Sequence, residues 1–240
     1  MIKYIFFVIM FLFILGGILI YVINRNKTDS SKKENWIKFI SYFLIVNLII
    51  ACIIYSHGYF YYVAIIISLL GLIEISRAIY YSRKYVTGFK TLLIYIPLVI
   101  VFIQFADLKQ NILLYTYIVV TIFDAFSQLS GQLFGKTKLV PAISPNKTWE
   151  GFIGGLASTC LIAVFFFRLI DISVLQTIIF SFSISIFSFF GDLLASLCKR
   201  KFDIKDFGKI LPGQGGILDR FDSLIFSSLI VSILNAYNFL

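Results

Sequence analysis

Charged residues are scarce in this chain of 240 residues. Asp, Glu, Lys and Arg make up 14% of the sequence, against 60% hydrophobic residues and a mean hydropathy of +0.95. A soluble protein of this length could not bury so much apolar surface, because much of any chain stays at the water boundary. The composition therefore excludes a soluble globular protein and predicts an all-α, polytopic integral membrane protein.

Histidine and cysteine are rarer still. The only histidine, His57, stands in a Ser-His-Gly segment that we predict to be an interfacial turn, away from other polar residues. Acid–base catalysis by histidine is therefore not expected. The three cysteines, Cys52, Cys160 and Cys198, have no paired spacing, so neither a disulfide framework nor a zinc site is predicted.

Apolar runs of about twenty residues, the length that crosses a bilayer core, recur along the whole chain. We predict eight transmembrane helices, which cover residues 4–24, 36–56, 59–81, 89–106, 111–130, 149–170, 173–195 and 217–239. The first four form an N-terminal region, 1–106. The others form a C-terminal region, 107–240, which carries two long polar loops, 131–148 and 196–216.

The cations predict the orientation of these helices. Seventeen of the twenty-one Lys and Arg residues lie in or beside the segments that follow the first, third, fifth and seventh spans. By the positive-inside rule, these segments and both long loops face the cytoplasm. Topology thus explains the net charge of +9 and no nucleic-acid partner is expected. We predict a protein of the plasma (inner) membrane.

Three charged residues interrupt the apolar spans. Glu74 and Arg77 are three residues apart and share a helical face, which favours a structural ion pair between them. Asp124 begins a polar stripe, with Gln128 and Gln132 at the i+4 and i+8 positions. An ionised Asp within a span costs roughly 2.5–3.5 kcal/mol. We therefore favour a wet or occupied cavity here over the alternative, a buried hydrogen bond between helices.

The stretch 191–223 concentrates the polar chemistry of the chain. It holds five of the twelve acidic residues and six of the twenty-one cations, with a Pro-Gly-Gln-Gly-Gly run at 212–216. Four of its carboxylates are hard oxygen donors of the kind that hold Mg²⁺ together with substrate phosphates. These candidate metal ligands are Asp192, Asp206, Asp219 and Asp222.

Cations and glycines of the same stretch suit a bound polyphosphate. Arginine matches phosphate geometry through its planar fork, and glycines allow backbone amides to approach a phosphate before a helix N-terminus. The candidate phosphate ligands are Lys199, Arg200, Lys205, Lys209, Arg220, Gly215 and Gly216. A solvated cytoplasmic loop would explain the lysines, but not the carboxylates among them or the Asp-Arg-Phe-Asp sequence that runs into hydrocarbon.

The order of these residues carries a resemblance. Ser196, Lys199 and Arg200, then Lys-Asp at 205–206, the glycine-rich run and Asp-Arg-Phe-Asp at 219–222 resemble the signature of the phosphatidate cytidylyltransferase (CDP-diacylglycerol synthase) family. The first loop is similar to a second marked stretch of that family, through Gly-Lys at 135–136 and Ser-Pro-Asn-Lys-Thr-Trp-Glu-Gly at 144–151. The first hundred residues resemble the family only in hydropathy, and Gln214 stands where the family commonly has histidine.

The resemblance implies a nucleotidyltransferase of phospholipid biosynthesis. It would convert CTP and phosphatidic acid to CDP-diacylglycerol and pyrophosphate with Mg²⁺, in a two-metal site formed by the four carboxylates. The catalytic residues would be Asp219, Asp222, Lys205 and Arg220, and the substrate-binding residues Ser144, Lys147, Thr148, Ser196, Lys199, Arg200, Gly215 and Gly216. A homodimer is also implied, and whether a monovalent cation accompanies the magnesium stays open.

Other functions stay open on the residues alone. A related CTP-dependent enzyme could act on another lipid phosphate, as a CDP-archaeol synthase does, or on a polyprenol. An ion-coupled transporter could use Asp124 and the C-terminal aspartates as its path, although transporters spread polar residues through mid-membrane segments of both halves. A purely structural membrane protein would not need so many intramembrane carboxylates.

Overall fold

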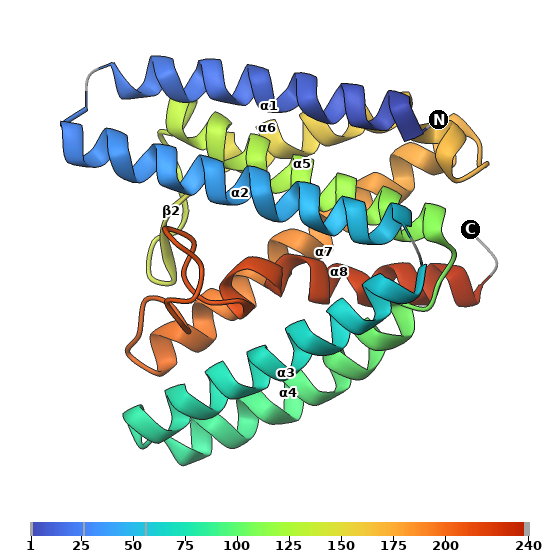
Figure 1. The fold of residues 1–240 in the computed structure, drawn as a ribbon. Coiled ribbons are helices and arrows are strands. Elements are labelled where there is room, and N and C mark those ends of the chain that lie inside the picture. Colours follow the sequence, from blue (N-terminus) through green and yellow to red (C-terminus); the bar gives the residue numbers. More distant parts are fainter. Residues whose placement is uncertain (1, 26, 56, 238–240) are drawn as a thin grey trace.

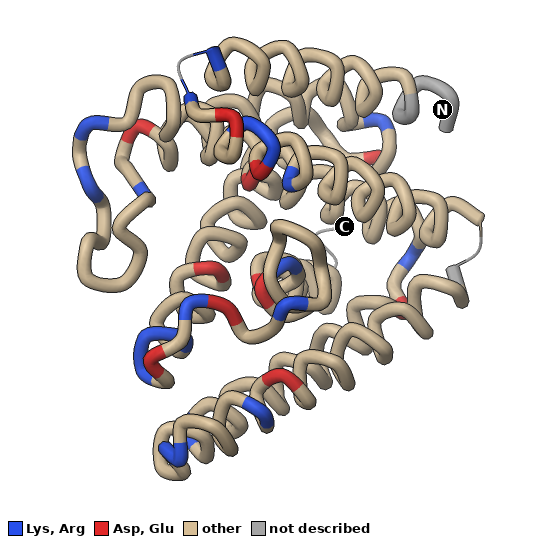
Figure 2. The backbone as a smooth tube through the Cα atoms, turned by 60° about the vertical axis from the view of Figure 1, so that its left-hand side comes forward, with Lys and Arg blue, Asp and Glu red and all other residues tan. Residues whose placement is uncertain are grey.

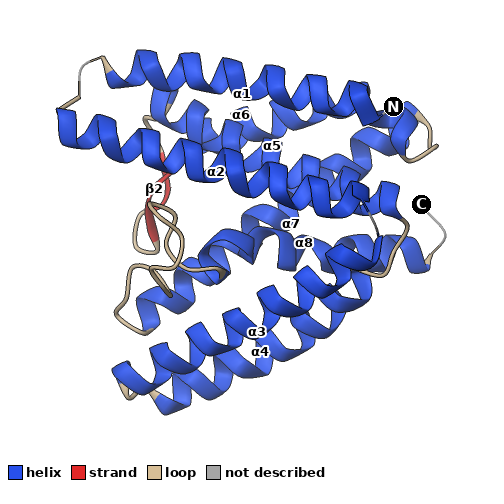
Figure 3. Cartoon of the chain, viewed as in Figure 1, coloured by secondary structure: helices blue, strands red, loops and turns tan. Residues whose placement is uncertain are grey.

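A computed structural model describes residues 2–25, 27–55 and 57–237, without the side chains of residues 2–6 and 57. The expected turn role of the His57 side chain and residues 238–239 of the eighth predicted span thus lie outside the described part. Within it the fold is nearly all-α, as predicted (Figure 3).

The described residues form eight α-helices, one 3₁₀ segment and one short β hairpin. The helices are α1 (Ile2–Asn24), α2 (Asp29–Tyr55), α3 (His57–Ser82), α4 (Tyr85–Phe105), α5 (Gln110–Phe134), α6 (Trp149–Ala163), α7 (Val174–Lys201) and α8 (Leu218–Ala236). The 3₁₀ segment η1 (Val164–Leu169) continues α6, and the strands are β1 (Lys138–Val140) and β2 (Ser144–Thr148). Each predicted span corresponds to one helix.

Seven of the helices, α1 to α7, are long and apolar enough to cross a membrane, α6 with η1 included. The eighth, α8, opens with Asp219, Arg220 and Asp222 in its first two turns, so its start is not apolar. From Ser223 to Leu234, α8 is an uninterrupted run of apolar residues and serines. The architecture is that of a polytopic membrane protein.

The four C-terminal helices form the centre of the bundle, and two helical hairpins flank them (Figure 1). α5 packs against α6, and α7 packs against α8. The α1–α2 hairpin contacts α5 through α2, whereas the α3–α4 hairpin contacts α8. The β hairpin, the α7–α8 loop and the α1–α2 and α3–α4 turns lie at one end of the bundle, and both termini lie near the other (Figure 1).

Small residues allow α5 and α6 to approach closely. A Cβ atom added to Gly151 would lie 2.7 Å from the carbonyl oxygen of Ser127, and one added to Gly154 would clash with the side chain of Ser130. Helices in membranes associate through such close backbone contacts, because lipid gives little hydrophobic drive for association. The contact fixes the β hairpin, which connects these two helices, beside α7.

Three differences from the sequence-based boundaries affect the polar segments. α7 continues to Lys201, so Ser196, Lys199 and Arg200 lie on its last two turns and not in a loop. The first polar loop contains an antiparallel hairpin that pairs Lys138 with Thr148 and Val140 with Ser144. α2 begins at Asp29, seven residues before the predicted span. The end of an apolar run predicts where a span leaves the hydrocarbon core. It does not predict where the helix ends, because backbone hydrogen bonds can continue the helix through polar residues.

Candidate active site

Charged residues are concentrated in the β hairpin, the end of α7, the α7–α8 loop and the start of α8 (Figure 2). Three ion pairs of this region bear on the site. They join Lys147 to Asp192, Lys199 to Asp219 and Arg220 to Asp124. Each pair connects two different elements of the chain, so the site is a product of the tertiary fold.

Asp219 holds the glycine-rich loop against α7. Its Oδ1 lies 2.8 Å from Nζ of Lys199, and its Oδ2 accepts hydrogen bonds from the backbone N–H of Phe207 at 2.8 Å and of Gly216 at 2.9 Å. The loop approaches closely at Gly215, whose φ of +87° is a backbone conformation that glycine adopts readily. Both carboxylate oxygens of Asp219 therefore already have partners within the protein.

The N-terminus of α8 rests on a carboxylate from α3. Glu74 accepts hydrogen bonds from the backbone N–H of Ile217 at 2.9 Å and of Leu218 at 2.8 Å, and only 1% of Glu74 is exposed. A Cβ atom added to Gly216 would lie 2.5 Å from Oε1 of Glu74, so glycine is required there. A negative charge at a helix N-terminus stabilises the helix.

The predicted ion pair between Glu74 and Arg77 is wrong. Among the described residues no ion pair joins the two, and Arg77 is exposed. Both bonds of Glu74 go to α8 instead. Helical spacing alone cannot reveal this arrangement, because the partner lies more than 140 residues further along the chain.

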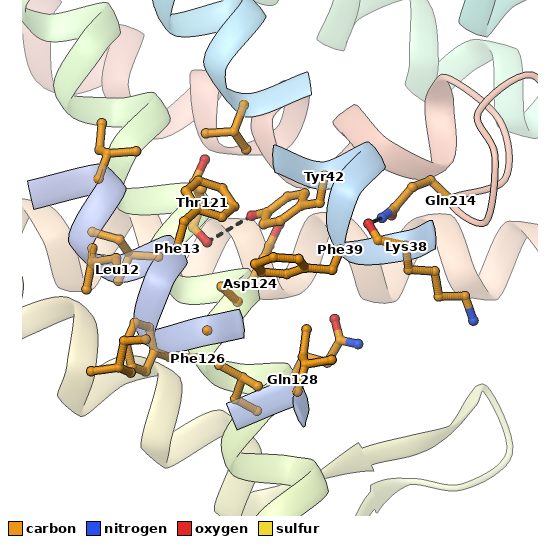
Figure 4. A pocket seen from close by; sticks show the side chains of 18 of the residues that line it. Leu12, Phe13, Lys38, Phe39, Tyr42, Thr121, Asp124, Phe126, Gln128 and Gln214 are labelled. Carbon is orange, nitrogen blue, oxygen red and sulfur yellow. Dashed lines mark hydrogen bonds between the residues drawn. The ribbon is translucent and has the colours of Figure 1, made fainter. Parts of the chain in front are cut away.

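Arg220 connects α8 to both α5 and α2. Its Nη2 lies 3.9 Å from Oδ2 of Asp124, and its guanidinium carbon lies 4.2 Å from the centre of the Tyr42 ring. Gln214 accepts a hydrogen bond from Nη1 of Arg220 at 3.1 Å and donates one to the carbonyl oxygen of Lys38 at 2.7 Å. Gln214 thus links the glycine-rich loop to α2, as Figure 4 shows.

Lys147 connects the β hairpin to α7. Its Nζ lies 2.9 Å from Oδ2 of Asp192 and 4.5 Å from the centre of the Phe189 ring. The other oxygen of Asp192 accepts a hydrogen bond from Ser196 at 3.3 Å. The first loop and the end of α7 therefore form one continuous polar surface.

Asp222 faces two further carboxylates. The charges of Asp192 and Asp124 both repel the charge of Asp222. α7 packs closely on α8 beside Asp192, because a Cβ atom added to Gly191 would lie 2.8 Å from the carbonyl oxygen of Asp222. Lys199 offsets part of the negative charge. A cation placed among these carboxylates would relieve the repulsion.

Comparison with known proteins now bears on this site. A model of the cytidylyltransferase family matches residues 1–238. This chain belongs to the cytidylyltransferase family. A phosphatidate cytidylyltransferase of Rickettsia conorii is 30% identical over 218 residues, which are 87% of this chain and 94% of that protein. The resemblance drawn from the sequence motifs is thereby confirmed, and it extends into the N-terminal half.

Staphylococcal relatives match over a shorter region. Phosphatidate cytidylyltransferases of Staphylococcus haemolyticus and Staphylococcus saprophyticus are 45% and 44% identical to this cytidylyltransferase family member over 124 residues. The match covers 51% of this chain and 48% of each relative. The chain thus aligns with about half the length of these relatives.

The structure does not gather all the predicted metal ligands of this chain into one group. Within the residues that it describes, no three His, Cys, Asp or Glu side chains lie close enough to hold one metal ion. Asp206 and Lys205 are exposed in the α7–α8 loop, and Asp219 has its own partners. The metal ligand set stays a prediction, and among its members the charge of Asp192 acts on that of Asp222.

The predicted substrate-binding residues also divide into two groups. Lys147, Ser196 and Lys199 line the polar surface. Thr148 is buried and caps α6 by accepting a hydrogen bond from the N–H of Gly151 at 3.1 Å. The others have different surroundings: Ser144 pairs within the β hairpin, and Arg200 donates to the carbonyl oxygens of Ile143 and Ile204. Gly215 and Gly216 lie in the α7–α8 loop against Asp219 and Glu74.

Sequence reasoning missed Tyr42 and the backbone of Lys38. Tyr42 lies in an apolar run of α2, where nothing distinguishes it from the other thirteen tyrosines of the chain. In the structure its hydroxyl donates to the carbonyl oxygen of Thr121 at 3.0 Å, which turns its ring toward Arg220. The N-terminal region, which has no sequence motif, therefore supplies one wall of the site.

Proposed function

We propose that this protein transfers the cytidylyl group of CTP to phosphatidic acid, forming CDP-diacylglycerol and pyrophosphate. A phosphate oxygen of the lipid attacks the α-phosphorus of CTP, and the bond from that phosphorus to the bridging oxygen of the β-phosphate breaks. The relatives that bear the name phosphatidate cytidylyltransferase support this reaction. The observation that carries it is the convergence of Lys147, Lys199 and Arg220 with Asp192 and Asp222 at one end of a membrane bundle.

Such a reaction needs alignment and neutralisation of charge more than it needs an activated nucleophile. A phosphate monoester is already an anion near neutral pH, so the absence of a histidine at position 214 is no obstacle. Cations placed around the phosphates stabilise the charge that develops on the departing pyrophosphate. Lys199 and Arg220 suit this role from within the site, and Lys205 and Arg200 would approach CTP from the exposed side.

Asp192 and Asp222 fit a magnesium site. Mg²⁺ is usually bound through one or two carboxylates, and waters and substrate phosphates complete its coordination. Asp192 and Asp222 are a donor pair of this kind, and their mutual repulsion favours a cation between them. Bound magnesium would neutralise phosphate charge and orient CTP. In this proposal Asp219 shapes the loop, while Asp206 lies close enough to Gly215 to join a second ion when CTP is bound.

The same proposal includes the membrane that holds the enzyme, its orientation there and its oligomeric state. The concentration of cations at the loop end of the bundle supports placing that end in the cytoplasm (Figure 2). CTP is a cytosolic solute, so the site would meet it there, and the plasma (inner) membrane would supply the lipid. We also propose a homodimer, by analogy with the family.

The deciding experiment is turnover by purified protein in liposomes. Phosphatidic acid and Mg²⁺ would be offered with each of the four nucleoside triphosphates, and lipid products identified by mass spectrometry. We expect CDP-diacylglycerol to form with CTP and not with the other three nucleotides. Chelation of the metal should abolish its formation. An ether-linked isoprenoid phosphate and a polyprenol would be offered in parallel. Product from these and not from phosphatidic acid would contradict the proposal, as would CTP-independent solute flux without any lipid product.

A further inference from the structure

Lys147 and Lys199 each pair with an aspartate of the site, but the two ammonium groups are held differently. Lys199 donates a hydrogen bond to Asp219, whose other oxygen accepts from two backbone amides. Nζ of Lys147 is shielded from solvent, yet it forms no hydrogen bond with any residue that the structure describes. Its ion pair with Asp192, at 2.9 Å, is therefore held by charge alone. Because an ammonium group carries three donors, the hydrogen-bonding capacity of Lys147 is unused.

Asp192 is the more accessible of the two aspartates. Its side chain is 42% exposed, against 3% for Asp219. One oxygen of Asp192 accepts a hydrogen bond from Ser196, and the other, Oδ2, faces Lys147. A cation that arrives from solvent can therefore reach Asp192, and Oδ2 is the oxygen for which it would compete with Lys147.

The charge of Lys147 acts on more than one carboxylate. Lys147 also attracts the charge of Asp124, which lines a cavity of about 190 Å³, as predicted (Figure 4). Asp124 and Asp192 in turn both repel Asp222. A magnesium ion at Asp192 and Asp222 would reduce the same repulsion with two charges in place of one. Mg²⁺ binds oxygen at about 2.0–2.1 Å, so an ammonium group 2.9 Å from the same oxygen would be repelled by the ion.

Lys147 joins the middle of β2 to α7, while the two ends of the hairpin have other attachments. At the base, Glu150 accepts hydrogen bonds from the backbone N–H of Thr137 at 3.1 and 3.2 Å. Near the tip, Arg200 donates to the carbonyl oxygen of Ile143 at 3.2 Å. The side chain of Lys147 is a flexible four-carbon stem. It can therefore change partner while the base and the tip of the hairpin stay in place.

We infer that Lys147 and a divalent cation are alternative partners of Asp192, and that binding of the cation redirects the ammonium group of Lys147 to a substrate phosphate. The inference rests on the proposed function, in which both substrates carry phosphate groups. Lys147 is then first a countercharge that keeps the carboxylates in place for the metal, and afterwards a phosphate ligand. One side chain thereby couples the binding of metal to the binding of phosphate.

Removal of Lys147 tests the competition without any substrate. Mn²⁺ would stand in for Mg²⁺, and its binding to purified protein in detergent would be measured from the electron paramagnetic resonance signal of the free ion. We expect Lys147→Met to bind Mn²⁺ about fivefold more tightly than wild type, because the metal no longer displaces a partly exposed ion pair. Lys138→Met, which removes an exposed cation from β1, should bind Mn²⁺ like wild type. Unchanged or weaker binding by Lys147→Met would overturn the inference.

A second measurement follows Lys147 itself and covers the case in which Lys147→Met does not fold. The lysines would be labelled as ¹³C-dimethyl groups, which keep their charge, and the nuclear magnetic resonance signal of Lys147 identified by its absence from Lys147→Arg. We expect Mg²⁺ to shift this signal and to leave that of Lys138 unchanged. A non-hydrolysable CTP analogue and dioleoyl phosphatidate would then each be added with Mg²⁺. The compound that shifts the signal further carries the phosphate that Lys147 contacts. A signal that Mg²⁺ does not move, or that neither compound moves further, would overturn the inference.

Failure of the exchange and failure of the proposed reaction give different results. Exchange of Lys147 for metal, without formation of CDP-diacylglycerol in liposomes, would uphold the exchange and reject the reaction. Formation of CDP-diacylglycerol by wild type, with equal Mn²⁺ affinities of wild type and Lys147→Met, would uphold the reaction and reject the exchange.

Discussion

Nζ of Lys199 lies 2.8 Å from Oδ1 of Asp219, with side-chain exposures of 11% and 3%. The pair joins the last turn of α7 to the first turn of α8 across the glycine-rich loop. Since the remaining oxygen of Asp219 holds two backbone amides of that loop, this contact organises the site and does more than balance charge.

We predict that Asp219→Asn lowers both activity and stability. Loss of one partner from a buried ion pair costs about 3–5 kcal/mol, because the other charge stays buried without compensation. Loss of one preorganised charge typically lowers kcat by about 10²–10³. Thermal unfolding in detergent and CDP-diacylglycerol formation would measure the two effects. The double variant Lys199→Met/Asp219→Asn should recover stability and not activity. Recovery of activity in the double variant would show that the pair has no part in the reaction.

Glu74→Gln should weaken the start of α8. Glutamine offers one acceptor oxygen where Glu74 uses two, so the N–H of Ile217 or Leu218 loses its partner. Loss of a helix cap costs roughly 0.5–2 kcal/mol, and we expect a matching drop in the unfolding free energy with a raised KM for CTP. Arg77→Gln, one turn away at an exposed position, is the control and should change neither. Equal behaviour of the two variants would mean that Glu74 does not position α8.

Gln214→His should introduce a pH dependence that the wild-type protein lacks. Neutral histidine can replace Gln214 in donating to Lys38 and accepting from Arg220. Its pKa is ordinarily about 6.5, and protonation removes the acceptor and adds a charge that repels Arg220. We expect kcat/KM of the variant to be retained near pH 8 and to fall, relative to wild type, as the pH decreases through about 6.5. If the pH profiles of kcat/KM for the variant and the wild type stay parallel between about pH 5 and 8, Gln214 does not position Arg220.

Asp222→Asn and Asp206→Asn should differ in their demand for magnesium. The charges of Asp192 and Asp124 repel that of Asp222, whereas Asp206 is exposed in the α7–α8 loop. We expect Asp222→Asn to raise the Mg²⁺ concentration for half-maximal activity by at least about tenfold, which corresponds to 1.4 kcal/mol of binding. Asp206→Asn should raise it less. A magnesium titration of activity compares them, and a larger effect at Asp206 would reassign the metal to the loop.

Much of the architecture could be predicted from the amino-acid sequence. Runs of about twenty apolar residues identified every helix, because the hydrocarbon core sets a minimum length and excludes unpaired backbone. The motif residues also identified the family, which the whole-chain match confirms. The exact ends of α2 and α7 could not be predicted, since a helix continues wherever its backbone hydrogen bonds do.

The site itself was decided by the tertiary structure. The sequence singled out Glu74, Asp124, Asp219 and Gln214 as unusual, but each has a partner on another element, up to 176 residues away. Spacing along one helix reports only neighbours three or four residues apart, so it suggested Arg77 for Glu74 in place of α8. It also gave no role to Tyr42, whose importance depends on the packing of α2 against α5. Hydropathy determined which segments enter the membrane. The docking of two flanking hairpins on four central helices determined which charges meet, because contacts between distant segments depend on packing that no local pattern records.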